Sequence, residues 1–222
     1  MTPVCIMAGG RGLRLHPLTE HKPKPLLKVG GRPILEQIID GFAGQGFKKF
    51  YLCVNYKADL IINHFGDGAA KGVKIRYVHE TEPMGTAGAL TLLPKMDVPI
   101  IVSNADVLAK IQYTNLMEFH ARSNADITVC LGLYQYQVPY GVASLDGDRI
   151  TEIQEKPIEN WAVNGGIYVI EPRAIAKMKP GHCDMTDLIA ACENIAAYQI
   201  EGYWTDVGQW QDLAAANQNW EP

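Results

Sequence analysis

The 222-residue sequence lacks any apolar run that approaches the roughly 18 residues a membrane-spanning helix needs. Its start, Met1-Thr-Pro, leads directly into an apolar segment, without the charged region, apolar core and cleavage site of a signal peptide. We therefore expect a cytoplasmic protein that does not act at a membrane.

An excess of positive charge is also missing, since 20 Lys and Arg residues stand against 24 Asp and Glu, a net charge of −4. That balance provides no overall basic field, so nucleic acid is not an expected partner. The five cysteines are scattered without a CxxC pair, which favours buried reduced thiols over a disulfide or a metal site. Repeats, linkers and low-complexity segments are absent, and a hydrophobic content of 47% suits a globular core.

What the sequence does contain is an anion-binding pattern near its start. An apolar strand-like run, 4–7, is followed by three glycines within 9–12, and then by Arg14 and by Lys24 between two prolines. Backbone N–H groups without side-chain bulk, beside fixed positive charge, suit a polyphosphate. The pattern is not a P-loop, because no Gly-Lys-Ser/Thr closes it, and it is not a dinucleotide fingerprint, because the second strand ends in Asn55 rather than in an acid.

Strand-like and helix-like segments alternate along the first half of the chain. Expected strands lie at 4–7, 49–55, 74–79 and 99–103, and expected helices at 33–42, 58–65 and 86–93. Helical crossovers between strands predict right-handed βαβ units. We expect an α/β protein with a three-layer Rossmann-like fold and a mainly parallel, mixed central sheet.

The second half has a different pattern, in which strands follow one another closely. Expected strands lie at 126–133, 141–145, 149–155, 163–170 and 197–201, and expected helices at 113–122, 172–178, 185–194 and 209–218. Asp146-Gly147-Asp148 predicts a hairpin turn. We expect one domain over 1–222 with two lobes, one at 1–110, which holds the anion-binding pattern, and a smaller α+β lobe at 111–222.

The loop resembles the signature of the sugar-1-phosphate nucleotidyltransferases, a small-Gly-Gly-x-Gly-Thr-Arg-Leu run followed by Pro-Lys-Pro. Five further motifs of that family, most similar to its GDP-sugar-forming branch, recur in order. The matching segments are Ala8-Gly-Gly-Arg-Gly-Leu-Arg-Leu15 with Pro23-Lys-Pro25, Glu82-Pro-Met-Gly-Thr-Ala-Gly88, Asp106, Glu155-Lys-Pro157, Val163-Asn-Gly-Gly166 and Trp204-Thr-Asp-Val-Gly208. The resemblance spans the chain and implies transfer of a nucleoside monophosphate from an NTP to a sugar 1-phosphate, with release of pyrophosphate. It implies a single nucleotidyltransferase domain over 1–222, with a nucleotide-binding lobe at 1–110 and a sugar-phosphate-binding lobe at 111–222.

The chemistry of that reaction matches the residue types. The departing pyrophosphate needs neutralising charge, for which the guanidinium of Arg14 and the ammonium of Lys24 are suited. The resemblance assigns Asp106 and Asp206 to Mg²⁺, an ion that usually takes one or two protein carboxylates. The remaining nucleotide contacts are expected from Ala8, Gly9, Gly10, Gly12, Glu80 and Gly85.

The sugar phosphate is expected to bind the second half. Lys156 would bind its phosphate through the positive charge of the ammonium group. We expect Arg14, Lys24, Asp106 and Lys156 to be the catalytic residues. Hydrogen bonds to hydroxyl groups and close backbone contacts are expected from Gly141, Glu155 and Asn164. The nucleophile, a phosphate monoester with a second pKa near 6, is mostly ionised at neutral pH and needs no general base.

Glu80 bears on the choice of nucleotide. Thymidylyl- and uridylyl-transferring relatives have glutamine at this position, five residues before Gly85. A carboxylate only accepts hydrogen bonds, and guanine offers two adjacent donors on its Watson–Crick edge, whereas uracil and thymine would oppose it with a carbonyl. GTP is therefore the expected substrate. If the Glu80 side chain is instead solvated, Glu82 or backbone atoms would recognise the base.

Three positions depart from the family pattern without removing a charge: Leu13 for threonine, Ala105 for glycine and Gly165 for alanine. Two alternatives to a guanylyltransferase stay open: the same chemistry with UTP or dTTP, and a non-catalytic module that binds sugar nucleotides. The sequence fixes neither the sugar, for which mannose, glucosamine and heptose types are candidates, nor whether the chain forms a homo-oligomer.

Overall fold

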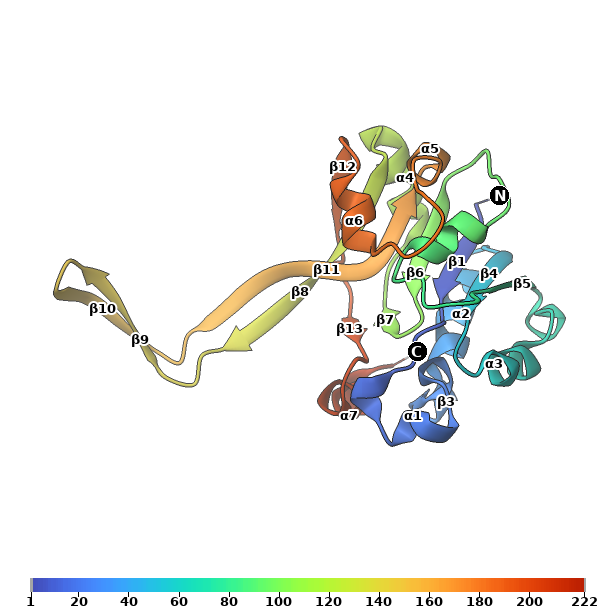
Figure 1. The fold of residues 1–222 in the computed structure, drawn as a ribbon. Coiled ribbons are helices and arrows are strands. Elements are labelled where there is room, and N and C mark those ends of the chain that lie inside the picture. The colour runs from blue at the N-terminus through green and yellow to red at the C-terminus, as the bar shows by residue number, and fades with distance from the viewer. Residues whose placement is uncertain (1, 222) are drawn as a thin grey trace.

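The computed structural model describes residues 2–221 and contains a seven-stranded sheet in the order β12-β8-β11-β6-β1-β4-β5 (Figure 1). Strands β1, β4, β5 and β6 run parallel, β12 runs parallel to β8, and β11 is antiparallel to both of its neighbours, β6 and β8. The strands are β1 (Val4–Met7), β4 (Lys49–Val54), β5 (Lys74–His79), β6 (Ile100–Asn104), β8 (Ile127–Gln137), β11 (Ile158–Ile170) and β12 (Ile195–Gln199). The expected mixed, mainly parallel sheet is confirmed, and strands from both halves of the chain share it.

Helices cover both faces of this sheet. The α-helices are α1 (Leu18–His21), α2 (Ile34–Gly44), α3 (Ala58–Phe65), α4 (Tyr113–Ser123), α5 (Pro172–Ile175), α6 (Met185–Ala190) and α7 (Trp210–Asn219). Short 3₁₀ helices are η1 (Leu13–Leu15), η2 (Lys24–Leu26), η3 (Ala69–Lys71) and η4 (Gly88–Leu92), and short strands pair as β2 (Lys28–Val29) with β3 (Arg32–Pro33) and β7 (Val107–Ala109) with β13 (Trp204–Asp206). None of the helices in the described part of the chain is long and apolar enough to cross a membrane.

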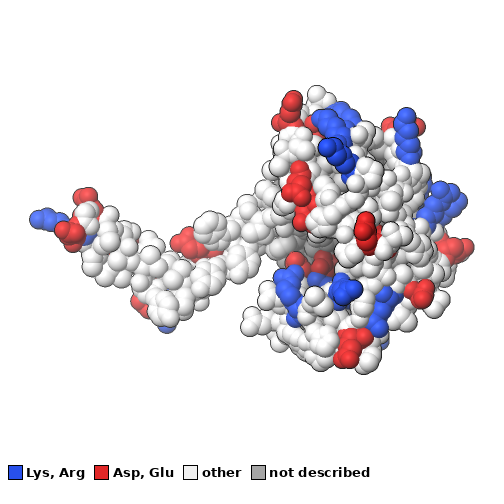
Figure 2. Space-filling model, in the orientation of Figure 1, with Lys and Arg blue, Asp and Glu red and all other residues white. Residues whose placement is uncertain are grey.

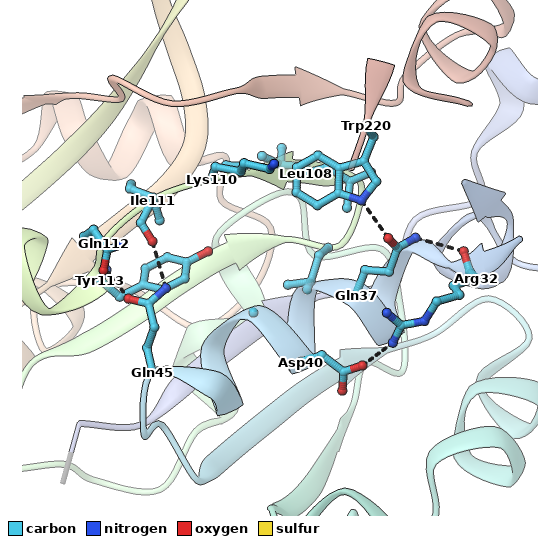
Figure 3. A pocket seen from close by; sticks show the side chains of 14 residues that line it. Arg32, Gln37, Asp40, Gln45, Leu108, Lys110, Ile111, Gln112, Tyr113 and Trp220 are labelled. Atoms are coloured by element: carbon cyan, nitrogen blue, oxygen red, sulfur yellow. Dashed lines mark hydrogen bonds and ion pairs between the residues drawn. The ribbon is translucent and has the colours of Figure 1, made fainter. Parts of the chain in front are cut away.

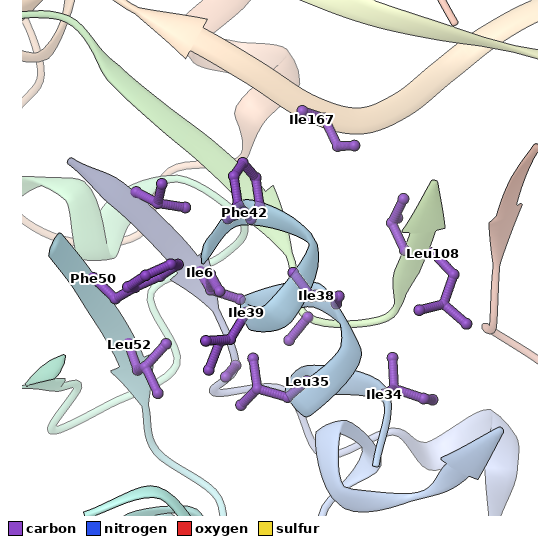
Figure 4. Close-up of a cluster of buried hydrophobic side chains, with 14 of the residues drawn as sticks. Ile6, Ile34, Leu35, Ile38, Ile39, Phe42, Phe50, Leu52, Leu108 and Ile167 are labelled. Carbon is purple, nitrogen blue, oxygen red and sulfur yellow. The ribbon is translucent and has the colours of Figure 1, made fainter. Parts of the chain in front are cut away.

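Two hydrophobic clusters lie on opposite faces of the sheet and give the fold its three layers. Successive strand residues point to opposite faces, so that in β1 Ile6 joins one cluster and Cys5 the other. Figure 4 shows the first cluster, where the apolar stripe of α2 packs against β1 and β4. Within that stripe Leu35 and Phe42 are fully buried.

The expected helix at 86–93 is wrong in type, because the structure has only the 3₁₀ helix η4 there. The N–H groups of Ala87 and Gly88 both donate to the carbonyl of Cys183, which ties the start of this segment to a distant part of the chain. The helices expected at 172–178 and 185–194 end early, at Ile175 and Ala190.

The strands expected at 126–133 and 163–170 are too short, because β8 and β11 continue outward as a paired ribbon. The ribbon leads into a hairpin of β9 (Gly141–Asp146) and β10 (Arg149–Glu155), which pair only with each other. We call residues 133–162 the arm; apart from the half-buried Val138 and Pro157, all of them are exposed. Figure 1 shows the arm extending away from the body of the molecule.

Candidate active site

The glycine loop follows β1, whose neighbours β4 and β6 are both parallel to it. Ligands of open α/β sheets collect at the carboxyl ends of such strands, and the loop borders a cavity of about 490 Å³ there. We call this the loop cavity. Its lining residues are Met7, Ala8, Gly9, Gly10, Arg11, Gly12, Leu13, Arg14, Lys24, Pro25, Asn55, Pro83, Ala105 and Asp106.

Lys24 is held inside the loop cavity. It starts the 3₁₀ helix η2, which Pro23 precedes in an extended conformation, and only 11% of its side chain is exposed. The ammonium forms an ion pair with Asp106 and lies 3.9 Å from Oδ1 of Asp206. A buried cation is stable in this position because two carboxylates face it.

The two aspartates, 100 positions apart in sequence, are brought together by a short antiparallel ladder. Asp106 lies in the turn between β6 and β7, and Asp206 ends β13, where it pairs with Val107. The backbone N–H of Val207 donates to the carbonyl of Asp106 over 2.9 Å. Because β7 and β13 fix the backbone, both carboxylates must point toward Lys24.

The electrostatics of this pair suit a bound cation. Burial and the neighbouring charge of Asp106 raise the pKa of Asp206 to about 6, against the opposing influence of Lys24 and Arg14. The buried Oδ1 atoms of both aspartates accept no hydrogen bond. Buried acceptors are normally satisfied, so these atoms fit a divalent ion. Residues 2–221 contain no group of three or more acidic, His or Cys ligands, and two carboxylates with phosphate oxygens are the usual Mg²⁺ set.

Arg14 completes this charge cluster. The loop places its guanidinium beside Asp206 and Gly208, so that a Cβ on Gly208 would lie 3.1 Å from Nη2 of Arg14 and 3.1 Å from Oδ1 of Asp206. Any side chain at 208 would therefore push against both charged groups. The structure thus brings Arg14, Lys24, Asp106 and Asp206 together, while their catalytic and metal-binding roles stay predictions.

Glu80 lies at the other end of the loop, next to Gly9. Its backbone carbonyl accepts a hydrogen bond of 2.7 Å from Asn55, and its Oε1 lies 2.5 Å from where a Cβ on Gly9 would be. Burial raises the pKa of Glu80, partly offset by a hydrogen bond from the backbone of Met84. Glu80 is thus a half-buried carboxylate beside the loop that does not line the loop cavity, and its nucleotide contact stays a prediction.

Gly85 does not line the loop cavity. A Cβ there would lie 2.6 Å from the carbonyl oxygen of Cys183, in the segment that leads into α6. Its neighbour Thr86 donates to Asp184 through its backbone N–H over 3.1 Å. The structure thus gives Gly85 a role in the close approach of these two segments, and its nucleotide contact stays a prediction.

A second, smaller cavity of about 210 Å³ opens on the other side of the aspartates, and we call it the Asn164 cavity. Asp206 lines it, whereas Asp106 lines the loop cavity, so the carboxylate pair stands where the two cavities approach each other. Asn164 accepts hydrogen bonds from Tyr168 Oη (2.8 Å) and from the N–H of Gly166 (3.1 Å), which fix its amide. The lining residues are Thr86, Asn104, Val107, Asn164, Gly165, Gly166, Tyr168, Met185, Thr186, Trp204 and Asp206.

The other three residues expected to bind the sugar phosphate lie elsewhere in the chain. Gly141, Glu155 and Lys156 belong to the arm, and none of them lines either cavity. In a single copy of the chain, the structure therefore does not bring these three residues to the site where they are predicted to bind the sugar phosphate.

Several lining residues were not singled out from the sequence. Arg11 and Leu13 are in the loop itself, so their position was an available signal. Thr86 and Trp204 lie inside recognised motifs but carry no charge, while Tyr168 carries no sequence signal because it reaches the cavity only through the pairing of β11.

A further cavity, of about 480 Å³, lies between α2, β7 and Trp220 (Figure 3). Its polar groups already bind one another. Gln37 accepts a hydrogen bond of 2.6 Å from the indole of Trp220, and Arg32 is paired with Asp40. This cavity brings together none of the charged residues described above.

Comparison with known proteins gives the family. Residues 4–221 match the Nucleotidyl transferase family, which accounts for almost the whole chain. The chain is a member of that family. Among its relatives, mannose-1-phosphate guanyltransferase of Yarrowia lipolytica is 36% identical over 94% of this chain, and the mannose-1-phosphate guanylyltransferase catalytic subunit beta of Drosophila pseudoobscura pseudoobscura is 33% identical over 96%. The chain spans 61% and 60% of the length of these relatives.

Solved structures of family members have the same fold. HddC from Yersinia pseudotuberculosis superimposes with a TM-score of 0.78, at 25% identity, over 100% of both chains. The structure of HddC complexed with GMP-PN superimposes with a TM-score of 0.79, at 24% identity, again over 100% of both chains. The expected Rossmann-like nucleotidyltransferase fold is therefore confirmed.

Proposed function

We propose that this protein transfers GMP from GTP to a sugar 1-phosphate of the mannose, glucosamine or heptose type, releasing pyrophosphate and forming a GDP-sugar. The observation that carries the proposal is the convergence of Arg14, Lys24, Asp106 and Asp206 where the two cavities approach each other. Family membership and the printed names of relatives, mannose-1-phosphate guanyltransferases, support it.

The triphosphate of the nucleotide would occupy the loop cavity. Backbone N–H groups of the glycine loop surround its phosphates, and Arg14 and Lys24 neutralise the charge that grows on the departing pyrophosphate. Lys24 is positioned before any substrate arrives, because its ion pair with Asp106 holds the ammonium in place. That preorganisation avoids the cost of moving a charge during the reaction.

The residues present fit Mg²⁺, with Asp106 and Asp206 as its protein ligands and phosphate oxygens and water as the others. When bound, the ion neutralises phosphate charge and draws the two substrates together. The free Oδ1 atoms of both aspartates are the atoms we assign to it. Removal of divalent ions with EDTA is expected to abolish pyrophosphate release and to leave the fold intact.

The sugar 1-phosphate would enter through the Asn164 cavity, on the opposite side of the aspartates. Its phosphate oxygen attacks the α-phosphorus of GTP, the bond to the pyrophosphate breaks, and no protein base is needed because the phosphate is already ionised. Asn164, held by Tyr168 and Gly166, presents its side-chain N–H₂ to a sugar hydroxyl.

Glu80 would select guanine. Its carboxylate lies beside Gly9 of the loop and would accept hydrogen bonds from N1–H and from the 2-amino group of the base. The burial that raises its pKa also strengthens a hydrogen bond to a donor pair, because water competes less there. We further propose a cytoplasmic location, where the two phosphorylated substrates would be available.

The proposal is tested by measuring pyrophosphate release with each of GTP, ATP, UTP, CTP and dTTP, with Mg²⁺ and a panel of sugar 1-phosphates. We expect activity with GTP and one or a few sugars. Arg14→Ala should lower kcat by on the order of 10³-fold, whereas Arg122→Ala, an exposed arginine in α4, should leave it unchanged. No release with any combination would overturn the enzymatic proposal in favour of a sugar-nucleotide-binding module, and activity with UTP or dTTP alone would overturn the assignment of GTP.

A further inference from the structure

The arm carries apolar side chains on one face that nothing in the chain covers. In the hairpin, Leu145 pairs with Ile150 and Ala143 with Ile153, so all four point to the same side. Leu145, Ile150 and Ile153 are 67%, 60% and 63% exposed. We call these three side chains the hairpin's apolar face.

The opposite face of the hairpin is polar. It carries Ser144, Asp146, Arg149, Glu152 and Gln154, with Val142 among them. This alternation is typical of an antiparallel sheet with one covered face and one face in water. An isolated two-stranded hairpin is marginally stable in water, so the apolar face calls for a partner surface.

The ribbon that supports the hairpin repeats the pattern with aromatic residues. Tyr134 pairs with Trp161, and Tyr136 lies two positions along the same face; the three are 51%, 58% and 49% exposed. Figure 2 shows that the visible surface of the arm is mostly uncharged, with charged side chains at its tip and near its middle. An extended apolar surface of this kind marks a protein–protein contact.

The direction of the arm is set by the sheet from which it grows. β8 and β11 are continuous from the central sheet into the arm. At its base, Trp204 packs against Gly132 and donates from its indole N–H to the carbonyl of Gly165 over 2.9 Å. The arm therefore cannot fold back onto its own body without breaking strand pairs and this tryptophan contact.

Lys156 consequently lies far from its own cavities. Eight positions separate it from Asn164 (164 − 156), which at about 3.3 Å per residue of extended strand is roughly 26 Å. The side chain of a lysine cannot bridge that distance. The arm thus removes from the site the lysine that the sequence analysis expects at the sugar phosphate, a role that we include in the proposed function.

The body of the protein has an apolar surface beside the loop cavity that matches the hairpin. Leu13, one of the departures from the family's sequence pattern, is 71% exposed at the cavity. Leu18 and Trp210 are 37% and 48% exposed, and the indole of Trp210 donates to the carbonyl of His16 over 3.3 Å, which places it beside η1 and α1. We call Leu13, Leu18 and Trp210 the rim patch.

We infer that the arm docks on a second copy of this chain, with its hairpin's apolar face on the rim patch of that copy, so that each copy donates Glu155 and Lys156 to the site of the other. A symmetric pair covers both apolar surfaces of each copy through two equivalent contacts, since each copy offers one arm and one rim patch. Glu155 lies on the same face as the apolar residues, where its pairing with Gly141 places it. The inference rests on the proposed function for the role of Lys156, while the docking itself rests on the apolar surfaces.

The docking is tested without reference to activity. The wild-type chain should sediment as a dimer, and Leu145→Ser/Ile150→Ser/Ile153→Ser should sediment as a monomer with unchanged secondary structure, because these side chains are exposed in the single copy. The matched control, Ser144→Ala/Glu152→Ala/Gln154→Ala on the polar face, should stay dimeric. A wild-type chain that is monomeric at every concentration would overturn the inference.

The placement of the arm is tested by cross-linking. A mixture of Ile153→Cys chains with Leu13→Cys chains, treated with a short bismaleimide, should give a covalent dimer on a denaturing gel, well above that from wild-type chains with their native cysteines. Gln154→Cys, on the opposite face, should give much less in the same mixture. A dimer that forms without this cross-link would show that another surface holds it together and would also overturn the inference.

The exchange of residues is tested by mixing two inactive variants. Lys156→Ala lacks the donated lysine, and Asp106→Asn lacks an acidic residue of the body, so each alone should be nearly inactive at a sugar 1-phosphate concentration near the wild-type KM, which lies well below the raised KM of Lys156→Ala. After unfolding and joint refolding in equal amounts, half of the dimers are mixed and each has one intact site of two, so roughly a quarter of wild-type activity should return. If the mixture still dimerises but recovers no activity, the donation of Lys156 is overturned. A wild-type chain that is inactive with all substrates would refute the proposed function instead, and the sedimentation and cross-linking results would then decide the docking.

Discussion

Replacing Lys24 by methionine tests whether the charge cluster is built as the structure indicates. Met has nearly the shape of Lys without its charge, so the substitution leaves Asp106 and Asp206 facing each other without the cation between them. Because Lys24 is almost fully buried, water has little access to the place of its ammonium between the two carboxylates. We expect lower stability together with lower activity.

The size of the stability loss follows from the geometry. Two unit charges at the 3.9 Å between Lys24 and Asp206 attract by about 4 kcal/mol at an effective dielectric constant of 20, and the 44% exposure of the Asp206 side chain reduces this by solvent screening. The pair with Asp106 is more enclosed, and removing one partner of such a pair typically costs 3–5 kcal/mol. After the exposure is taken into account, we expect Lys24→Met to lower the free energy of unfolding by about 2–4 kcal/mol at neutral pH.

Urea unfolding, followed by the fluorescence of the four tryptophans, measures this loss in the presence of EDTA and at one fixed protein concentration. The double variant Lys24→Met/Asp106→Asn removes one of the two facing carboxylates and should recover most of the lost stability. It should not recover kcat, because the pyrophosphate would still lack its ammonium. Lys22→Met, at an exposed position two residues earlier, is the control and should change neither quantity.

Two results would refute the reasoning. An unfolding free energy for Lys24→Met within about 0.5 kcal/mol of wild type would show that the lysine does not compensate the aspartates, since surface substitutions usually fall in that range. Stability that is lost in Lys24→Met but not regained in the double variant would show that packing, and not charge, is the reason.

The remaining predictions concern the base, the sugar phosphate and pH. Glu80→Gln should lower kcat/KM for GTP by about 5- to 150-fold, the equivalent of 1–3 kcal/mol per base contact, and raise it for UTP; equal losses for every NTP, or the same shift in the control Glu82→Gln, would contradict the assignment. Lys156→Ala should raise KM for the sugar 1-phosphate much more than KM for GTP, and the reverse pattern in steady-state kinetics would refute its role. Burial holds the pKa of His120 below its ordinary 6.5. As the pH falls, the unfolded chain therefore binds the proton of His120 before the folded chain does. The contribution of this residue to the free energy of unfolding is complete above pH 6.5 and should decrease below it. His120→Gln should therefore flatten the decline in Tm between pH 7.5 and 5.5, while the exposed His79→Gln should follow wild type.

The local pattern of the sequence was sufficient for most of the core. Residues 4–7, 49–55 and 74–79 are strand-like and separated by helical periodicity, and each is a parallel strand in the structure. The hairpin at 141–155 was predicted by its turn residues, because Asp-Gly between two strands leaves few alternatives. The helix at 86–93 was predicted wrongly in type, since the segment is a 3₁₀ helix whose start binds the distant Cys183, and no local pattern reports such a contact.

For the site, too, the sequence predicted what depends on neighbouring residues, and the structure supplied what depends on distant ones. Arg14 and Lys24 were evident from the sequence because both lie in the segment that begins with the glycine loop, Arg14 two residues after Gly12 and Lys24 between two prolines further on. Asp106 and Asp206 were paired only through the family resemblance, and the structure adds the physical reason, the pairing of β7 with β13. These two strands have three residues each, too few for a pattern to predict.

The sequence by itself determined the alternation of elements, the phosphate-binding loop and the kinds of charge available, because each of these depends on neighbours within a few residues. The tertiary structure alone decided that the aspartates leave two oxygens free beside Lys24, and that Gly141, Glu155 and Lys156 stand on an arm outside the site of their own copy. Strand pairing decides both, since it joins residues far apart in the chain and fixes the direction in which a ribbon leaves the sheet.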